Sequence, residues 1–187
     1  VLPKIAQTCE TRGITIVSTG DFTHPAWFKS MTEELVEAQE GIYRLKDGSS
    51  PTRFIIGTEV ASIKKHKDQT RRVHLLLFSP NLGVTEQFNK TLAERGYNLK
   101  ADGRPILGLT SKQILEIMLE TDERMFMIPA HAWTPWFGIF GSKGGYNTLE
   151  EAFDELTPRV RAIETGLSSD PLMNWRLSEL DDVTLIS

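Results

Sequence analysis

Two apolar runs decide the fold: Arg53-Phe-Ile-Ile-Gly-Thr-Glu-Val60 and Arg72-Val-His-Leu-Leu-Leu-Phe78. Both are rich in β-branched, aromatic and aliphatic residues, which is typical of buried strands. The link between them, Lys64-Lys-His-Lys-Asp-Gln-Thr-Arg71, is short and polar. The two runs are therefore predicted to pair as a hairpin.

Strand and helix patterns alternate on both sides of this hairpin. Further strands are predicted at residues 14–19, 126–130, 160–164 and 183–186. Apolar residues at the 3.6-residue spacing predict helices at residues 2–12, 27–38, 86–95, 111–119 and 172–180. Gly13 is expected to end the first helix, and Thr110 with Gln113 forms the pattern of a capping box. The alternation favours an α/β fold with a mainly parallel sheet.

Length and composition fit one globular domain over residues 1–187. The chain has 187 residues, 40% apolar and 25% charged, which leaves room for a hydrophobic core. It begins at Val1 and ends in a strand-like stretch at 183–187. We therefore expect a central piece of a domain, with flanking strands missing at both ends.

Hydropathy, cysteine content and net charge limit the cellular location and the binding partners that we expect. No apolar run approaches the roughly 18 residues that a membrane helix needs, and no secretory leader pattern opens the chain. A single cysteine, Cys9, rules out an internal disulfide and suits the cytoplasm; its helical surroundings favour a small buried residue. The net charge of −4 argues against broad nucleic-acid binding by this piece, although a local basic site is compatible with it.

Residues of metal-binding types gather where predicted strands end. Asp21 and His24 follow the first strand, Glu59 lies near the end of the second, His131 follows residues 126–130, and Glu164 ends its strand. Polar residues at C-terminal strand ends are typical of the active face of a (β/α) barrel, and a doubly wound sheet binds ligands there too. Imidazoles with carboxylates are ligands of Zn²⁺, Mn²⁺ or Fe²⁺. From residue types alone, a metal site and structural roles both stay open.

Four segments resemble successive motifs of the PHP (polymerase and histidinol phosphatase) family. They are Ser18-Thr-Gly-Asp-Phe-Thr-His-Pro25, Gly57-Thr-Glu-Val60, Arg71-Arg-Val-His-Leu-Leu-Leu77 and Pro129-Ala-His-Ala-Trp-Thr-Pro135. The spacing Asp21-Phe-Thr-His24 is most similar to the endonuclease Q group of that family. The family's opening His-x-His and closing Asp-x-His motifs are absent from the chain, and we expect them to flank it.

The resemblance implies both a fold and a chemistry. The fold would be a distorted, TIM-like (β/α)7 barrel of the PHP type, incomplete at both ends. The metal ligands would be His24, Glu59, His74 and His131, with Glu59 bridging ions and Glu59 and Asp21 serving catalysis. The complete domain would hold two to three ions of Zn²⁺ (or Mn²⁺ or Mg²⁺). The chain by itself is expected to bind metal weakly and not to cleave DNA.

The activity that the resemblance implies is metal-dependent phosphodiester hydrolysis in DNA repair. The enzyme would be an endonuclease that cuts on the 5′ side of deaminated bases such as uracil and hypoxanthine. Two alternatives stay open, a small-molecule phosphatase of the histidinol-phosphate type and a non-catalytic PHP module of a larger replication or repair protein. A base-stacking platform would favour the nuclease, because a small phosphate ester does not need one.

Two segments are candidates for contacts with DNA. One is a Gly-rich stretch that follows His131 and carries Trp133, Trp136, Phe137, Phe140, Lys143 and Tyr146. It offers either an aromatic surface for bases or a loop packed over the barrel mouth. The other is the part of the hairpin around its link, whose basic residues are Lys64, Lys65, Lys67, Arg71 and Arg72. These residues would contact phosphates or form a solvated turn that protects a sheet edge. His66, in the same link, is predicted to be solvated.

Overall fold

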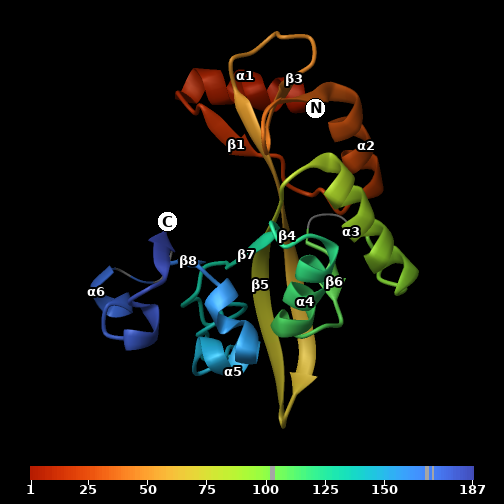
Figure 1. Cartoon of the computed structure of the whole chain (residues 1–187). Coiled ribbons are helices and arrows are strands. Elements are labelled where there is room, and N and C mark those ends of the chain that lie inside the picture. Colours follow the sequence, from red (N-terminus) through yellow and green to blue (C-terminus); the bar gives the residue numbers. More distant parts are fainter. Residues whose placement is uncertain (102–103, 167–168, 170) are drawn as a thin grey trace. The chain divides into compact units, whose positions relative to one another are not determined.

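The computed structural model describes residues 1–101, 104–166, 169 and 171–187 of an α/β protein (Figure 1). Its contacts divide the chain into two compact units. The first comprises residues 1–59 and 78–105, and the second comprises residues 60–77 and 106–187. The single domain over residues 1–187 stays a prediction.

The predicted hairpin is confirmed, and its strands are longer than the apolar runs. Strands β4 (Arg53–His66) and β5 (Gln69–Ser79) are hydrogen-bonded neighbours joined by Lys67 and Asp68 alone. Lys67 takes a positive φ of 53°, as tight hairpin turns require. A two-residue link allows only an antiparallel pair, since parallel strands need a crossover of roughly a dozen residues or more.

The sheet built on this hairpin is open and mostly antiparallel, so the prediction of a mainly parallel sheet is wrong. Its strand order is β2-β3-β4-β5-β7, and β1 and β6 also pair with β4. The pairs β1–β4 and β4–β6 are parallel, whereas β2–β3 and β3–β4 are antiparallel. Among the described residues, β2 and β7 are the two edge strands of this order and do not pair with each other, so a closed TIM-like barrel is not seen. The strands not yet bounded are β1 (Ile16–Ser18), β2 (Leu35–Gln39), β3 (Ile42–Leu45), β6 (Ile106–Leu107) and β7 (Phe126–Pro129).

Three helices cover the first unit. They are α1 (Leu2–Arg12), α2 (Pro25–Glu34) and α3 (Leu82–Glu94). As predicted, α1 ends at Gly13, whose φ of 70° suits glycine, and Cys9 is buried. The predicted helix at 27–38 is too long, because the chain turns extended at Leu35. There β2 pairs with β3, and this pairing overrides the helical spacing.

The core of the first unit is aromatic and aliphatic. Phe22 and Phe88 meet edge to face with ring centroids 6.2 Å apart, and both are fully buried together with Phe54. Strand β1 is not the buried strand that the sequence predicts, since Ile16 is 51% exposed. The prediction takes β-branched residues to be buried. In β1, however, Ile16 and Ser18 are exposed and Val17 is half-buried.

The second unit contains α4 (Ser111–Thr121), whose predicted capping box is confirmed. The Thr110 hydroxyl accepts the Gln113 N–H, and the Gln113 side chain accepts the Thr110 N–H. The predicted helix at 172–180 is instead two short pieces. The other elements of the second unit are α5 (Leu149–Phe153), η1 (Asp154–Arg159), β8 (Ala162–Glu164), α6 (Pro171–Asn174), η2 (Ser178–Leu180) and β9 (Thr184–Ile186). Strands β8 and β9 pair in parallel. Within the described part of the chain, no helix is long and apolar enough to cross a membrane.

Candidate metal centre

Three residues on neighbouring strand segments supply donor atoms to one group. Glu59 lies on β4, His74 lies on β5, and His131 follows the end of β7. One ligand atom of each lies within 4.8 Å of the others. Among residues 1–101, 104–166, 169 and 171–187, this is the one group of three or more such side chains that meets the spacing. The structure thus brings together three of the four ligands that the sequence predicts.

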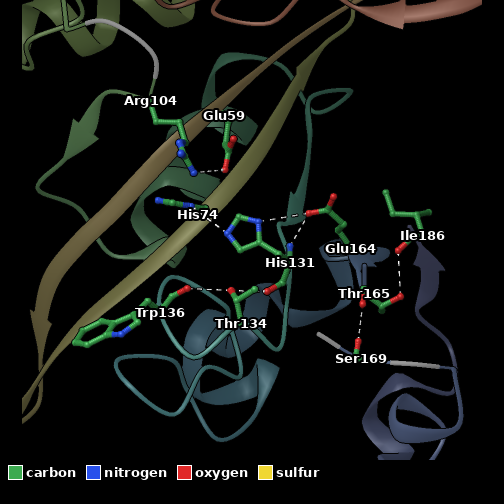
Figure 2. A network of polar contacts seen from close by, with 10 residues as sticks. All are labelled: Glu59, His74, Arg104, His131, Thr134, Trp136, Glu164, Thr165, Ser169 and Ile186. Atoms are coloured by element: carbon green, nitrogen blue, oxygen red, sulfur yellow. Dashed lines mark hydrogen bonds and ion pairs between the residues drawn. The ribbon is translucent and has the colours of Figure 1, made fainter. Parts of the chain in front are cut away.

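The two histidines of the group are in direct contact (Figure 2). The Nδ1 atom of His74 lies 3.0 Å from the Nε2 atom of His131, and the rings are nearly perpendicular at 87°. Two imidazole nitrogens bound to one Zn²⁺ at about 2.0–2.1 Å lie about 3 Å apart when the angle at the metal is about 90°. The observed spacing therefore fits both nitrogens into one coordination sphere, and Glu59 adds an oxygen donor.

His74 is fixed from two sides. Its imidazole stacks on the Phe137 ring, with centroids 4.2 Å apart and planes 16° from parallel. Its backbone N–H donates to the carbonyl of Phe137 at 2.9 Å, and its carbonyl accepts the N–H of Ala130 at 3.0 Å. Only 8% of the residue is exposed. Phe137 thus determines where the His74 ring lies, a role that the sequence analysis did not assign to it.

His131 depends on Glu164, the last residue of β8. The backbone N–H of His131 donates to Glu164 Oε2 at 2.6 Å, and the N–H of Ala132 donates to the Glu164 carbonyl at 2.7 Å. The same carboxylate oxygen lies 3.6 Å from Nδ1 of the imidazole. The sequence places Glu164 at a strand end but does not reveal its partner, which is 33 positions away.

Glu59 is paired with a residue that sequence reasoning missed. Its Oε1 atom accepts a hydrogen bond from Arg104 Nη1 at 3.1 Å, in an ion pair whose side chains are 28% and 45% exposed. No local pattern links the two residues, because they are 45 positions apart. The guanidinium offsets the carboxylate charge beside the two imidazoles, so Glu59 does not require a metal ion to be compensated.

Asp21 and His24 form a turn at the start of α2, in the first unit. The His24 N–H donates to the Asp21 carbonyl at 2.9 Å, and Pro25 begins the helix. Asp21 is exposed, with a φ of 43°. Neither residue belongs to the three-residue donor group. Their roles as ligand and catalytic residue therefore stay predictions.

Most of the aromatic segment packs inward. Trp133 Nε1 donates to Asn174 Oδ1 at 2.7 Å, and its ring meets Phe140 at 4.8 Å. Tyr146 is 4% exposed, and burial raises the pKa of its phenol. Among the aromatic residues of this segment, Trp136 is the exposed one, at 56%, and Lys143 is exposed as well. Tyr146 is thus buried, whereas Trp133, Phe137 and Phe140 are half-buried, and the role of these four residues in base contact stays a prediction.

The basic residues of the hairpin likewise differ in burial, since some have partners inside the protein and others are exposed. Arg71 is buried; its Nη2 donates to Glu151 Oε1 at 2.7 Å, Nη1 donates to the Gly145 carbonyl, and the guanidinium lies 4.7 Å over the Tyr146 ring. The Arg71 guanidinium thus has internal partners, and its contact with phosphates stays a prediction. His66 meets the Tyr146 ring at 5.7 Å and is half-buried, so the prediction of a solvated side chain is wrong. Outside these contacts lie the exposed Lys64 and Lys65 and the half-buried Arg72.

The charge of Arg71 is balanced by a carboxylate of the same unit, that of Glu151. The backbone N–H of Asn147 and the Arg71 guanidinium hold the pKa of the Glu151 carboxyl below its ordinary value. Asn147 donates to Glu151 Oε2 from its backbone at 2.9 Å. This carboxylate thus joins the turn end of the hairpin to the end of the segment that begins at His131.

These elements define an α/β protein with a candidate metal site of two histidines and one glutamate. No family model matches the chain. It is 28% identical over 190 residues to the uncharacterized protein YqxK of Bacillus subtilis (strain 168), covering 95% of this chain and 44% of that protein. It is also 27% identical over 124 residues to an uncharacterized protein of Methanocaldococcus jannaschii, covering 66% of this chain and 13% of that one.

Two solved structures are similar to almost the whole chain. The lesion-specific endonuclease PfuEndoQ from Pyrococcus furiosus gives a TM-score of 0.79 at 27% identity, over 98% of this chain and 41% of that one. The second structure is endonuclease Q in complex with a 27-mer duplex that has an abasic lesion at the active site. Its TM-score is 0.81 at 28% identity, over 99% of this chain and 42% of that one. The chain thus spans less than half the length of these proteins.

Proposed function

We propose that this chain is part of a metal-dependent endonuclease of the PHP type that acts on damaged DNA. The observation that carries the proposal is the donor group of Glu59, His74 and His131. It occurs in a chain that is similar over 98–99% of its length to lesion-specific endonuclease structures. An imidazole and carboxylate donor set suits Zn²⁺ or Mn²⁺, and Mg²⁺ less well.

The residues of the group have distinct roles in this proposal. A metal ion held there would lower the pKa of its bound water to about 7 and neutralise the phosphoryl oxygens. His74 and His131 supply neutral nitrogen donors, and Glu59 supplies a carboxylate that can bridge two ions. His24 would be the fourth ligand and Asp21 a catalytic residue, in a distorted barrel of the PHP type that holds two to three ions in all.

The proposed substrate is DNA with a damaged base, and deaminated bases such as uracil and hypoxanthine are the finer proposal. Trp136 supports it as the exposed ring on which an unstacked base could lie. Stacking of this kind contributes about 1–3 kcal/mol per base. Lys64, Lys65 and Lys143 are exposed cations for phosphates.

The test measures metal content and cleavage in the longest form of the protein that the gene encodes. Duplexes carry a 5′ label and one uracil, one hypoxanthine, one abasic site or no lesion. His74→Ala and His131→Ala are expected to lower both bound metal after dialysis and lesion cleavage. His66→Ala is the matched control, because His66 lies outside the donor group, and it should keep its metal.

Three outcomes would contradict the proposal. They are cleavage that survives chelation, metal content that does not change in either histidine variant, and equal cleavage of intact and damaged duplexes. Hydrolysis of a small phosphomonoester without DNA cleavage would favour a histidinol-phosphate-type phosphatase instead. Metal binding with neither activity would favour a non-catalytic module.

A further inference from the structure

The backbone at Glu164 is positioned by strand pairing. Glu164 lies opposite Ile186 in the parallel pair of β8 and β9, and the next N–H, that of Thr165, donates to the Ile186 carbonyl at 2.7 Å. The preceding residue, Ile163, is fully buried. From this fixed point the side chain extends toward His131 (Figure 2).

Glu164 holds the backbone of His131 in an unfavourable conformation. The φ of His131 is 33°, in the left-handed region that residues other than glycine seldom adopt. Such a conformation persists where surrounding contacts fix it. Here the side chain of Glu164 accepts the N–H of His131 at 2.6 Å, and its carbonyl accepts the next N–H, that of Ala132, at 2.7 Å.

The same carboxylate also acts on the imidazole. Its Oε2 atom lies 3.6 Å from Nδ1 of His131, which is beyond hydrogen-bond length but within the range of strong electrostatic interaction. A lone pair on Nδ1 would be repelled by this oxygen, whereas an N–H there is attracted. The neutral ring therefore favours a proton on Nδ1 and a lone pair on Nε2, the nitrogen that lies 3.0 Å from His74 Nδ1.

We propose that Glu164 is a positioning residue that fixes both the backbone conformation and the tautomer of His131, and so selects Nε2 as the nitrogen offered to the donor group. In the metal-free protein His74 Nδ1 then carries the proton shared between the two rings. The use of Nε2 as a metal ligand rests on the proposed function. The conformation and the tautomer of the metal-free protein do not.

The experiment reads the tautomer directly by NMR. Long-range ¹H–¹⁵N correlation spectra of metal-free protein with ¹⁵N-labelled histidine distinguish Nδ1–H from Nε2–H. They are recorded at about pH 8, above the ordinary histidine pKa of about 6.5, and His131→Gln assigns the signals. The wild-type protein should show His131 as the Nδ1–H form, and a wild-type Nε2–H form would overturn the proposal.

Three variants separate positioning from a merely structural role. Glu164→Gln keeps an oxygen that can accept the His131 N–H but removes the charge, so the His131 population should shift toward Nε2–H. Glu164→Asp restores the charge and should restore the Nδ1–H form in part. Glu179→Gln is the matched control, because Glu179 Oε2 also accepts a backbone N–H, that of Leu149 at 2.9 Å, outside the donor group. An unchanged spectrum in folded Glu164→Gln would also overturn the proposal.

Metal affinity is the second measurement. Chelator competition with Zn²⁺ should show binding at least about ten-fold weaker in Glu164→Gln than in Glu179→Gln, the usual cost of losing a carboxylate behind a histidine ligand. Equal affinities would refute the step from tautomer to metal binding. If the wild-type tautomer is as expected but no Zn²⁺ binds, the proposed function fails while the role of Glu164 in the metal-free protein stands.

Discussion

Removing the carboxylate of Glu151 should cost the second unit a large part of its stability. Glu151 is the ionic partner of Arg71, at 2.7 Å, and the two side chains are only 16% and 9% exposed. In Glu151→Ala the guanidinium would keep its contacts with the Gly145 carbonyl and the Tyr146 ring. It would, however, have lost the anion that compensates its charge.

The size of the effect follows from this burial. Removing one partner of a buried ion pair leaves an uncompensated charge, which costs about 3–5 kcal/mol. Arg71→Met should cost less, since the carboxylate left behind still accepts the Asn147 N–H at 2.9 Å. The double variant should be more stable than the sum of the single effects implies, with a coupling energy above about 1 kcal/mol.

Urea unfolding of the wild type, both single variants and the double variant measures these quantities. Lys112 and Glu155 provide the matched control: their ion pair has the same 2.7 Å length in the same unit, but Glu155 is 68% exposed. Glu155→Ala should give no measurable change, because solvent screens an exposed pair. If Glu151→Ala behaves like Glu155→Ala, or if the coupling energy is near zero, the anchoring role of this pair is refuted.

Three further predictions concern Gly57, the pH dependence of Glu151, and Trp136. Gly57→Ala should destabilise the protein by about 1–3 kcal/mol in urea, because the added Cβ would lie 2.4 Å from Ser18 Oγ and 2.9 Å from Phe78 Cε1; Ser18→Gly should restore part of the loss. The pKa of Glu151 is lowered by the Asn147 N–H and by Arg71, so its contribution to stability is present above the ordinary value of 4.5 and is lost as pH falls through the lowered pKa; Glu151→Gln should flatten the fall in stability below pH 4.5, and an unchanged slope would contradict this. Trp136→Ala should weaken binding to lesion DNA about ten-fold, at about 1.4 kcal/mol per decade, without loss of stability, whereas equal binding would assign Trp136 no role in base contact.

Local sequence patterns predicted the elements that local interactions determine. The helix at Leu2–Arg12 and the Thr110–Gln113 capping box follow from residue spacing and from hydrogen bonds within one turn. The hairpin at 53–78 follows from two apolar runs and a short polar link. The helix predicted at 27–38 failed because residues 35–39 form a strand instead, and strand pairing with residues 42–45 is absent from the helical pattern.

The candidate site depended on contacts that no local pattern records. The resemblance to a family gave Glu59, His74 and His131, which the structure brings together. It gave neither Arg104, 45 positions from Glu59, nor Glu164, 33 positions from His131. These partners are fixed only when the chain folds, so residue types and spacing could not have shown them.

Each donor of the candidate centre is held by a partner that is not a metal. Arg104 pairs with Glu59, the Phe137 ring stacks on His74, and Glu164 holds the backbone of His131. Because these contacts form within the protein itself, folding already carries much of the cost of ordering the three donors. A metal ion would then meet donor atoms that already lie within 4.8 Å of one another. Loss of the Phe137 ring or of the Glu164 carboxylate should therefore weaken metal binding while leaving all three donor residues in the chain, which is the behaviour expected of a preorganised site.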